Sequence, residues 1–213
     1  MKTDDLVALL ATGVAPVPPH AARRRIGQAL FIGLPVSMAI LFIGFGVRDD
    51  IASAMLQPMF WVKLLFPLCI AAAALVALHR LGRPGIRTGW TWAGLLLPIL
   101  AVWALALGHK LTGFLVDQIP AVQGGSWLAC VMSIALISLP VLVATLLALR
   151  ELAPTRPALA GAAAGALAGG VAAAVFALHC KELAPASLAI WHLLGMVIPT
   201  LAGALLGRRL LRW

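Results

Sequence analysis

Six long runs of apolar residues, separated by short polar connections, dominate the pattern along this chain. They cover residues 27–47, 61–78, 90–107, 127–149, 158–178 and 188–207. Each run is close to the ~20 residues that a helix needs to cross the hydrocarbon core of a bilayer. None alternates polar and apolar residues in the way that is typical of barrel strands. The pattern therefore predicts an all-α, polytopic membrane protein with six transmembrane helices.

Basic residues are concentrated on alternate connections between the runs. One set comprises Lys2, Arg23, Arg24, Arg25, Arg80, Arg83, Arg87, Arg150, Arg156, Arg208, Arg209 and Arg212, and the other comprises Arg48, Lys63, Lys110 and Lys181. Cytoplasmic connections carry the excess of Lys and Arg in membrane proteins. The asymmetry predicts that both termini are cytoplasmic. It also accounts for the net charge of +9 without a direct nucleic-acid partner.

Composition leaves little of the chain outside the predicted membrane domain. Of 213 residues, 62 % are hydrophobic and only 11 % are charged. We divide the chain into a cytoplasmic segment (1–26) and a six-helix membrane domain (27–213). The first apolar run is too long for a cleaved signal and lacks a small-residue cleavage site, so we expect an uncleaved span in a bacterial inner membrane. Lys63, the one charged residue within the runs, is expected to extend its ammonium group to the membrane interface.

The first ten residues have the pattern of a short amphipathic helix. Asp4 and Asp5 would lie in its first turn, where the helix dipole favours negative charge, and Leu6, Leu9 and Leu10 would share one face. So short a helix is marginal alone and would be ordered mainly by a partner or the membrane surface. Three prolines then predict an extended tether. The segment is either a docking motif or a solvated tail that only helps to orient the chain.

Three cysteines are separated by the predicted topology. Cys69 falls in the middle of the second run, whereas Cys130 and Cys180 both fall near the outer side of the membrane. The fifth run contains glycines at four-residue spacing: Gly161, Gly165 and Gly169. If that glycine face packs against the fourth run, Cys130 and Cys180 become neighbours and a disulfide is possible. Equally, both thiols could be inert small side chains in the protein interior.

Histidines offer a second interpretation of the same region. His109, His179 and His192 also map to the outer side, and with Cys130 and Cys180 they could bind a soft metal ion. Their spacing matches no known metal motif, and each could instead be a hydrogen-bonded structural residue. No catalytic constellation is present in the sequence, so we expect neither enzyme activity nor a cofactor. A small transporter or metal-handling protein remains the alternative to a regulator.

Five short motifs connect the chain to a known family. They are Lys-Thr-Asp-Asp-Leu at 2–6, Gly-Ser-Trp-Leu-Ala-Cys at 125–130, Pro-Thr-Arg-Pro-Ala-Leu-Ala-Gly at 154–161, His-Cys at 179–180 and Gly-Arg-Arg-Leu-Leu-Arg-Trp at 207–213. On these motifs the chain resembles the NrsF-type anti-sigma factors, six-span bacterial inner-membrane proteins that negatively regulate an extracytoplasmic-function sigma factor. The resemblance runs from end to end.

The resemblance implies roles for particular residues. It implies that Lys2, Thr3, Asp4, Asp5 and Leu6 take part in holding a sigma factor, and that Cys130 and Cys180 are paired signal-sensing cysteines. Leu9 and Leu10 would join Leu6 in a groove of the partner. We therefore expect the membrane protein to sequester the sigma factor and to release it on a redox or metal stress. A membrane redox enzyme is disfavoured, because the sequence has no Cys-x-x-Cys pair.

Overall fold

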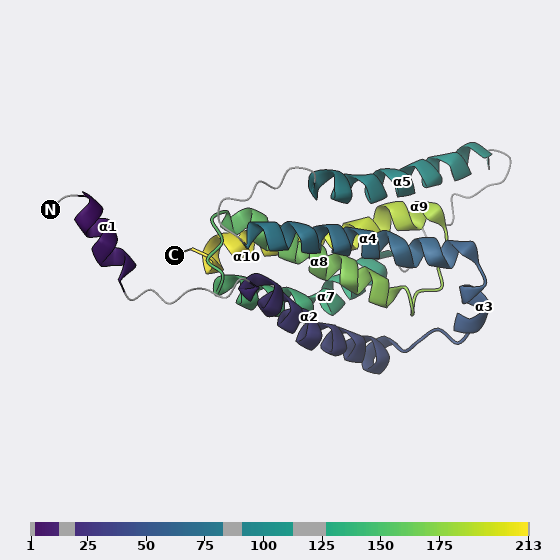
Figure 1. Ribbon diagram of the computed structural model, residues 1–213. Coiled ribbons are helices and arrows are strands. Elements are labelled where there is room, and N and C mark those ends of the chain that lie inside the picture. The colour runs from purple at the N-terminus through teal and green to yellow at the C-terminus, as the bar shows by residue number, and fades with distance from the viewer. Residues whose placement is uncertain (1–2, 13–19, 83–90, 113–126, 213) are drawn as a thin grey trace.

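The computed structural model describes residues 3–12, 20–82, 91–112 and 127–212 (Figure 1). Helices account for most of these residues, and none of them forms a β-strand. The helices are α1 (Thr3–Ala11), α2 (Ala21–Ile40), α3 (Ile51–Met55), α4 (Pro58–Leu81), α5 (Thr91–Thr112), α7 (Trp127–Arg150), α8 (Pro157–Phe176), α9 (Pro185–Ser187) and α10 (Leu193–Leu210). Two π-helices, η1 (Leu41–Phe45) and η2 (Leu188–His192), extend α2 and precede α10. The prediction of an all-helical chain is confirmed for the described residues.

The central helix of the bundle is α8, which packs against α4, α7 and α10. Its most apolar stretch is 83 % buried within the protein, compared with 28 % for the stretch in α2. The reason lies in its composition, because 14 of the 20 residues of α8 are alanine or glycine. Small side chains allow several helix backbones to approach at once, and in lipid this packing is a principal source of helix association.

The glycine face of α8 contacts α10. A Cβ atom at Gly165 would overlap the carbonyl oxygen of Pro199, and one at Gly161 would overlap that of Gly203. The condition considered from the sequence, that this face packs against the fourth apolar run, now α7, is therefore not met. Helix α7 contacts both α8 and α10.

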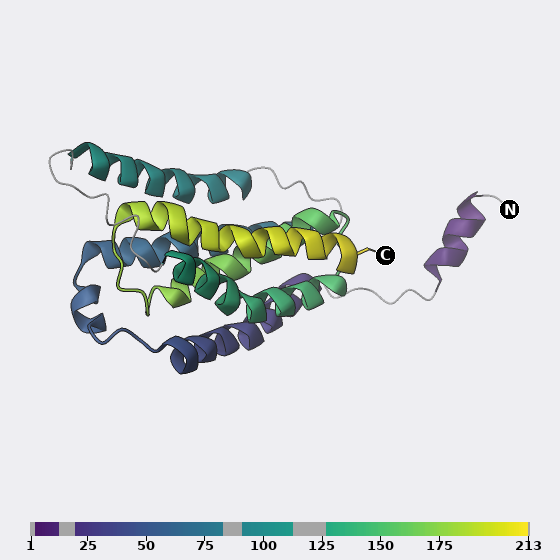
Figure 2. The same cartoon turned by 180° about the vertical axis from the view of Figure 1, so that it is seen from behind.

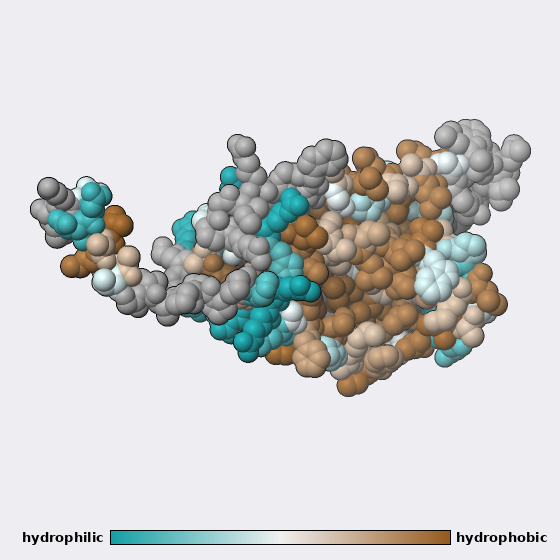
Figure 3. All heavy atoms as spheres, in the orientation of Figure 1, coloured by the Kyte–Doolittle hydropathy of each residue, from teal (hydrophilic) through white to brown (hydrophobic). Residues whose placement is uncertain are grey.

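Five helices in the described parts of the chain are long and apolar enough to cross a membrane. They correspond to the first, second, fourth, fifth and sixth predicted runs. The third run corresponds to α5, which lies against α4 and whose described apolar stretch is Ala93–Gly108. On the face seen in Figure 3, hydrophobic residues form a broad surface over the bundle. The membrane character of the helices is thus supported, while the count of six spans and the orientation of the termini stay predictions.

The bundle has two chemically different ends (Figures 1 and 2). We call the end where α2 begins and α10 finishes the terminal end. There Arg25 pairs with Glu151 at 2.7 Å, joining the start of α2 to the residue after α7. We call the opposite end, where α7 begins and α8 finishes, the cysteine end. There Trp127 stacks on Trp191 with ring centroids 4.8 Å apart, which ties the start of α7 to η2.

Helix α1 lies apart from the bundle in both views, beyond the terminal end (Figures 1 and 2). It begins at Thr3, with Asp4 and Asp5 in its first turn as predicted. Leu6, Val7 and Leu9 are all exposed. This short helix therefore carries apolar side chains that the bundle does not cover.

Candidate functional site

The structure brings Cys130 and Cys180 together at the cysteine end. Cys130 lies in the first turn of α7 and Cys180 lies four residues beyond α8. Both are buried, both are free thiols, and their side chains are within hydrogen-bonding reach of each other. Cys69, by contrast, is exposed on the side of α4. The two thiols are neighbours even though the glycine face is turned towards α10.

Lys63 reaches the same place from α4. Its side chain is fully buried, and its Nζ donates hydrogen bonds to the carbonyl oxygens of Cys180 at 2.7 Å and of Glu182 at 2.6 Å. The expectation that Lys63 extends to the membrane interface is wrong. The ammonium turns inward because the carbonyl groups of Cys180 and Glu182, in the connection after α8, accept its hydrogen bonds.

Arg48 holds the connection after α8 from the other side. Its guanidinium donates to both carboxylate oxygens of Asp50, at 2.8 and 2.7 Å, and approaches the Cys180 carbonyl at 3.5 Å. Its backbone N–H donates to the carbonyl of Leu178 at 3.2 Å. The hydrogen bonds from Arg48 lower the pKa of Asp50 from its ordinary 3.8 to about 2. Two cations from different segments thus converge on one carbonyl group, that of Cys180.

Both π-helices place a residue at this site. η1 ends at Phe45 and is followed by Gly46, whose φ of 75° favours glycine, and the Gly46 carbonyl accepts a hydrogen bond from His179 Nδ1 at 3.0 Å. η2 places His192 in the interior, where its ring lies 6.2 Å from that of Phe176. Insertions of this kind in α-helices frequently occur at functional sites. Here they orient the two histidines differently, one towards a backbone carbonyl and one towards the thiols.

His192 is buried without a conventional hydrogen bond. The residue is 1 % exposed, and neither ring nitrogen has a partner of ordinary hydrogen-bond geometry among the described residues. The ring is nevertheless close enough to Cys180 to stabilise its thiolate. Because a buried unpaired polar group is unfavourable, such a ring calls for an explanation.

These neighbours lower the pKa of the Cys180 thiol. The largest cause is the hydrogen bond with Cys130, followed by His192 and Lys63, and together they outweigh the opposing effect of burial. Cys180 lies outside the spanning helices, in the connection between α8 and α9. Its environment therefore favours the thiolate.

The alternative of a metal site finds no support in the described residues. No group of three His, Cys, Asp or Glu side chains among them is arranged to hold a metal ion. His179 bonds to Gly46, while the side chain of His109 lies outside what the structure describes. The metal interpretation of His109, His179 and His192 stays an untested hypothesis.

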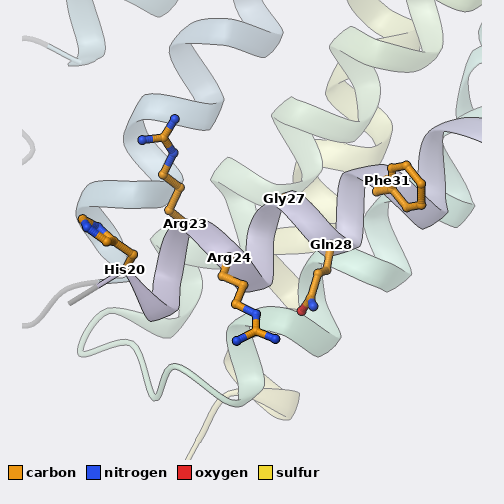
Figure 4. Close-up of a pocket in the computed structure, with 6 residues that line it drawn as sticks. All are labelled: His20, Arg23, Arg24, Gly27, Gln28 and Phe31. Carbon is orange, nitrogen blue, oxygen red and sulfur yellow. The ribbon is translucent and has the colours of Figure 1, made fainter. Parts of the chain in front are cut away.

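A shallow hollow of about 570 Å³ lies at the terminal end, beside the start of α2. Its lining consists of His20, Arg23, Arg24, Gly27, Gln28 and Phe31. In Figure 4 the side chains of Arg23 and Arg24 point to different sides of α2. The two arginines therefore do not converge on one ligand, and their position suits the basic flank of a membrane span.

The predicted docking residues are described only in part. Asp4, Asp5, Leu6 and Leu9 all have exposed side chains on α1, the two leucines being 41 % and 68 % exposed. Lys2 and the side chain of Leu10 lie outside the described residues. Sequence reasoning missed Lys63 and Arg48 as parts of the cysteine end. The signal for Lys63 was its position inside an apolar run.

Comparisons with known proteins agree on one family. Residues 10–213 match the family model NrsF, described as negative regulator of sigma F. Over its whole length and theirs, the chain is 44 % identical to the probable anti-sigma-F factor NrsF of Azospira oryzae and 37 % identical to the anti-sigma-F factor NrsF of Caulobacter vibrioides. No solved structure matches the chain. The chain therefore belongs to the NrsF family of negative regulators of sigma F.

Proposed function

We propose that this protein is a membrane anti-sigma factor that holds an extracytoplasmic-function sigma factor through its N-terminal segment and releases it when Cys130 and Cys180 are oxidised. It works in the bacterial inner membrane, with six spans and both termini in the cytoplasm. Its partners are the sigma factor and the bilayer, and no catalysis is involved. Family membership favours this regulatory function over the alternative of transport or metal handling.

The observation that carries the docking half is the exposed face of α1. Leu6 and Leu9 present apolar surface that the bundle leaves uncovered, next to the carboxylates of Asp4 and Asp5. An amphipathic helix of this kind binds by inserting its apolar face into a groove. The acidic first turn would then meet basic groups at the rim of that groove.

The sensing half is supported by the neighbourhood of the two thiols. Oxidation would join Cys130 on α7 to Cys180 after α8, and so add a covalent link between α7 and the connection that follows α8. Cys180 is also connected to α4 through Lys63 and to the segment after η1 through Arg48. A change at this sulfur therefore acts on several elements at once, which is what a switch between two bundle arrangements requires.

Deletion of residues 2–10 tests the docking half. The full-length and shortened proteins are each co-expressed with the partner sigma factor, solubilised in detergent and purified through a C-terminal tag. We expect the shortened protein to enter the membrane fraction normally and to recover no sigma factor. Because α1 lies apart from the bundle, the deletion should leave the thermal unfolding of the bundle unchanged. Undiminished recovery of sigma factor would refute the docking role.

A further inference from the structure

Lys63 is a buried cation without an acidic partner. Both of its described hydrogen bonds go to neutral carbonyl groups. The nearest acidic side chain on that connection, Glu182, instead accepts a hydrogen bond from the N–H of Ala184 at 2.9 Å. No described carboxylate lies within salt-bridge distance of the ammonium. A fully buried charge is very unfavourable unless an opposite charge compensates it.

The compensating group within reach is the sulfur of Cys180. Lys63 interacts with this thiol as well as with the carbonyl of the same residue. The unpaired ring of His192 faces the same sulfur and has a free nitrogen that can take the thiol proton. Cys130 lies in the first turn of α7, where Cys180 is the largest influence on its sulfur and Lys63 a smaller one. The two sulfurs are thus chemically unequal, although both are buried.

We propose that Cys180 is the sulfur that reacts first with an oxidant, that Cys130 resolves the product into a disulfide, and that Lys63 and His192 are positioning residues that hold the Cys180 thiolate. This inference rests on the proposed function and deepens it, since it states how the signal is received. The lowered pKa of Cys180, set mainly by its hydrogen bond with Cys130, agrees with this order. The reactant class is a hydroperoxide, small enough to reach a buried sulfur.

The chemistry proceeds in two balanced steps. The proton of Cys180 passes to His192, and the thiolate attacks one oxygen of the hydroperoxide, so that an S–O bond forms and the O–O bond breaks. The departing oxyanion takes the proton from His192, leaving a sulfenic acid on Cys180. The sulfur of Cys130 then attacks the Cys180 sulfur, the S–O bond breaks, and hydroxide leaves as water with the Cys130 proton. Two thiols and one hydroperoxide become one disulfide, one water and one alcohol, or a second water with hydrogen peroxide.

Several charged or titratable groups face Cys180, and each can affect its pH profile. They are Lys63 from α4, Arg48 with Asp50 from the segment after η1, Cys130 from α7, His192 from η2, and Glu182 from the same connection. Arg48 is already neutralised by Asp50, so its net effect on the sulfur is small. Lys63 is the cation of this set that has no carboxylate partner among the described residues. Its removal should therefore move the profile most.

The test measures the oxidation rate of each sulfur separately. Full-length protein in lipid nanodiscs, with Cys69→Ser as the background, carries either Cys130→Ser or Cys180→Ser. Hydrogen peroxide is the probe, and intact-protein mass spectrometry follows the gain of one oxygen atom between about pH 3 and about pH 9, a range that spans the lowered pKa of Cys180 and the ordinary pKa of a thiol. We expect the remaining Cys180 to be oxidised at least tenfold faster than the remaining Cys130 at neutral pH. Equal rates, or a faster Cys130, would overturn the proposed order.

The positioning role has its own readout in the pH profile. With Cys180 as the remaining thiol of the pair, Lys63→Met should slow its oxidation and shift the midpoint of its rate profile to higher pH, whereas Lys63→Arg should keep the midpoint. His192→Gln should slow the oxidation too. This variant provides the test of the positioning residues if Lys63→Met fails to fold. A loss of packing alone would not move the midpoint. An unshifted midpoint in a folded Lys63→Met protein would refute the role of Lys63.

Sigma-factor release, followed on samples that retain both cysteines of the pair, separates this inference from the proposed function. If peroxide releases the sigma factor but Cys130 reacts first, the order is wrong and the function stands. If Cys180 reacts first and the sigma factor stays bound, the reactivity assignment stands and the sensing function fails.

Discussion

At the cysteine end, charged and polar groups are buried and tied to backbone; on α1, apolar groups are exposed and touch nothing in the bundle. Lys63 and His192 are at most 1 % exposed, whereas Leu9 is 68 % exposed. Polar side chains are unfavourable in the interior and large apolar side chains are unfavourable in water, unless another group compensates them. At the cysteine end the compensation comes from within the chain. On α1 the bundle supplies none to the described leucines, which is why we propose docking through α1 and sensing at the cysteine end.

The largest effect on stability should come from the bundle core that holds the cysteine end in place. Gly165→Ala places a methyl group against the backbone of Pro199 on α10, so the two helices must separate. We expect a loss of about 3 kcal/mol or more in the free energy of unfolding, at the upper end of the usual range for overpacking. Unfolding in detergent, followed by tryptophan fluorescence, measures this loss.

Gly27→Ala is the matched control, because a Cβ at Gly27 meets nothing within 4 Å. It should be neutral or slightly stabilising, since alanine is the better helix former. Equal destabilisation by the two substitutions would show that the close contact of α8 and α10 is not what holds the bundle together.

The next largest effect should be on the affinity for the sigma factor, without an effect on the stability of the bundle. Leu9→Asp introduces a charge into the apolar face of α1, and we expect about a hundredfold weaker binding of the sigma factor, roughly 2.7 kcal/mol. The thermal midpoint of the bundle should not change. Ala8→Asp makes the same substitution on the opposite side of the helix and should keep the affinity within about threefold. Similar losses from both substitutions, in titrations by isothermal calorimetry, would contradict docking through one face.

Lys63→Met should destabilise the bundle moderately. It removes the hydrogen-bond donor of two carbonyl groups, that of Cys180 buried and that of Glu182 part-buried, at about 1–3 kcal/mol for a buried group left unsatisfied, and also removes a buried charge, which offsets part of that loss. We expect a net loss of about 1–2 kcal/mol in the free energy of unfolding. Lys181→Met, whose side chain is 65 % exposed, should change stability by less than about 0.5 kcal/mol. An equally small effect of Lys63→Met would mean that the ammonium does not hold the connection.

The smallest effect should be a pH dependence at Asp50. Because its pKa is lowered from 3.8 to about 2 in the folded protein, Asp50 stabilises the fold above pH 3.8, and this contribution is lost as the pH falls through about 2. The thermal midpoints of wild type and Asp50→Asn should therefore converge as the pH is lowered from about 5 to about 2. Asp49→Asn alters a side chain that is 98 % exposed and should follow wild type throughout. A constant difference for Asp50→Asn would contradict the pairing with Arg48.

Sequence reasoning recovered the parts of the fold that hydrophobicity and helical geometry determine. Five of the six apolar runs became long apolar helices, and the positions of Cys130 and Cys180 near the ends of their runs correctly placed them at one level. Sequence reasoning failed where the result depends on which helix packs against a given helix face. A row of glycines indicates close packing but not the neighbour, so the sequence left open whether this face lies against α7 or, as the structure has it, against α10.

The same limit explains what was missed at the cysteine end. A lysine near the end of an apolar run normally turns outward to water. Lys63 turns inward because the carbonyls of residues 180 and 182 are nearby, and these come from a connection more than a hundred residues away. The two π-helices, of five residues each, were missed as well. The face of α1, by contrast, needs no tertiary partner and could be predicted.

The central claim is that the two thiols at the cysteine end control how tightly α1, which lies beyond the terminal end, binds the sigma factor. The most direct test is the dissociation constant of the sigma factor, measured with one preparation in nanodiscs before and after treatment with peroxide. We predict at least tenfold weaker binding after oxidation, reversal by a reducing agent, and no change in Cys130→Ser. Affinity that stays the same in the oxidised wild-type protein, or that falls equally in Cys130→Ser, would contradict the account.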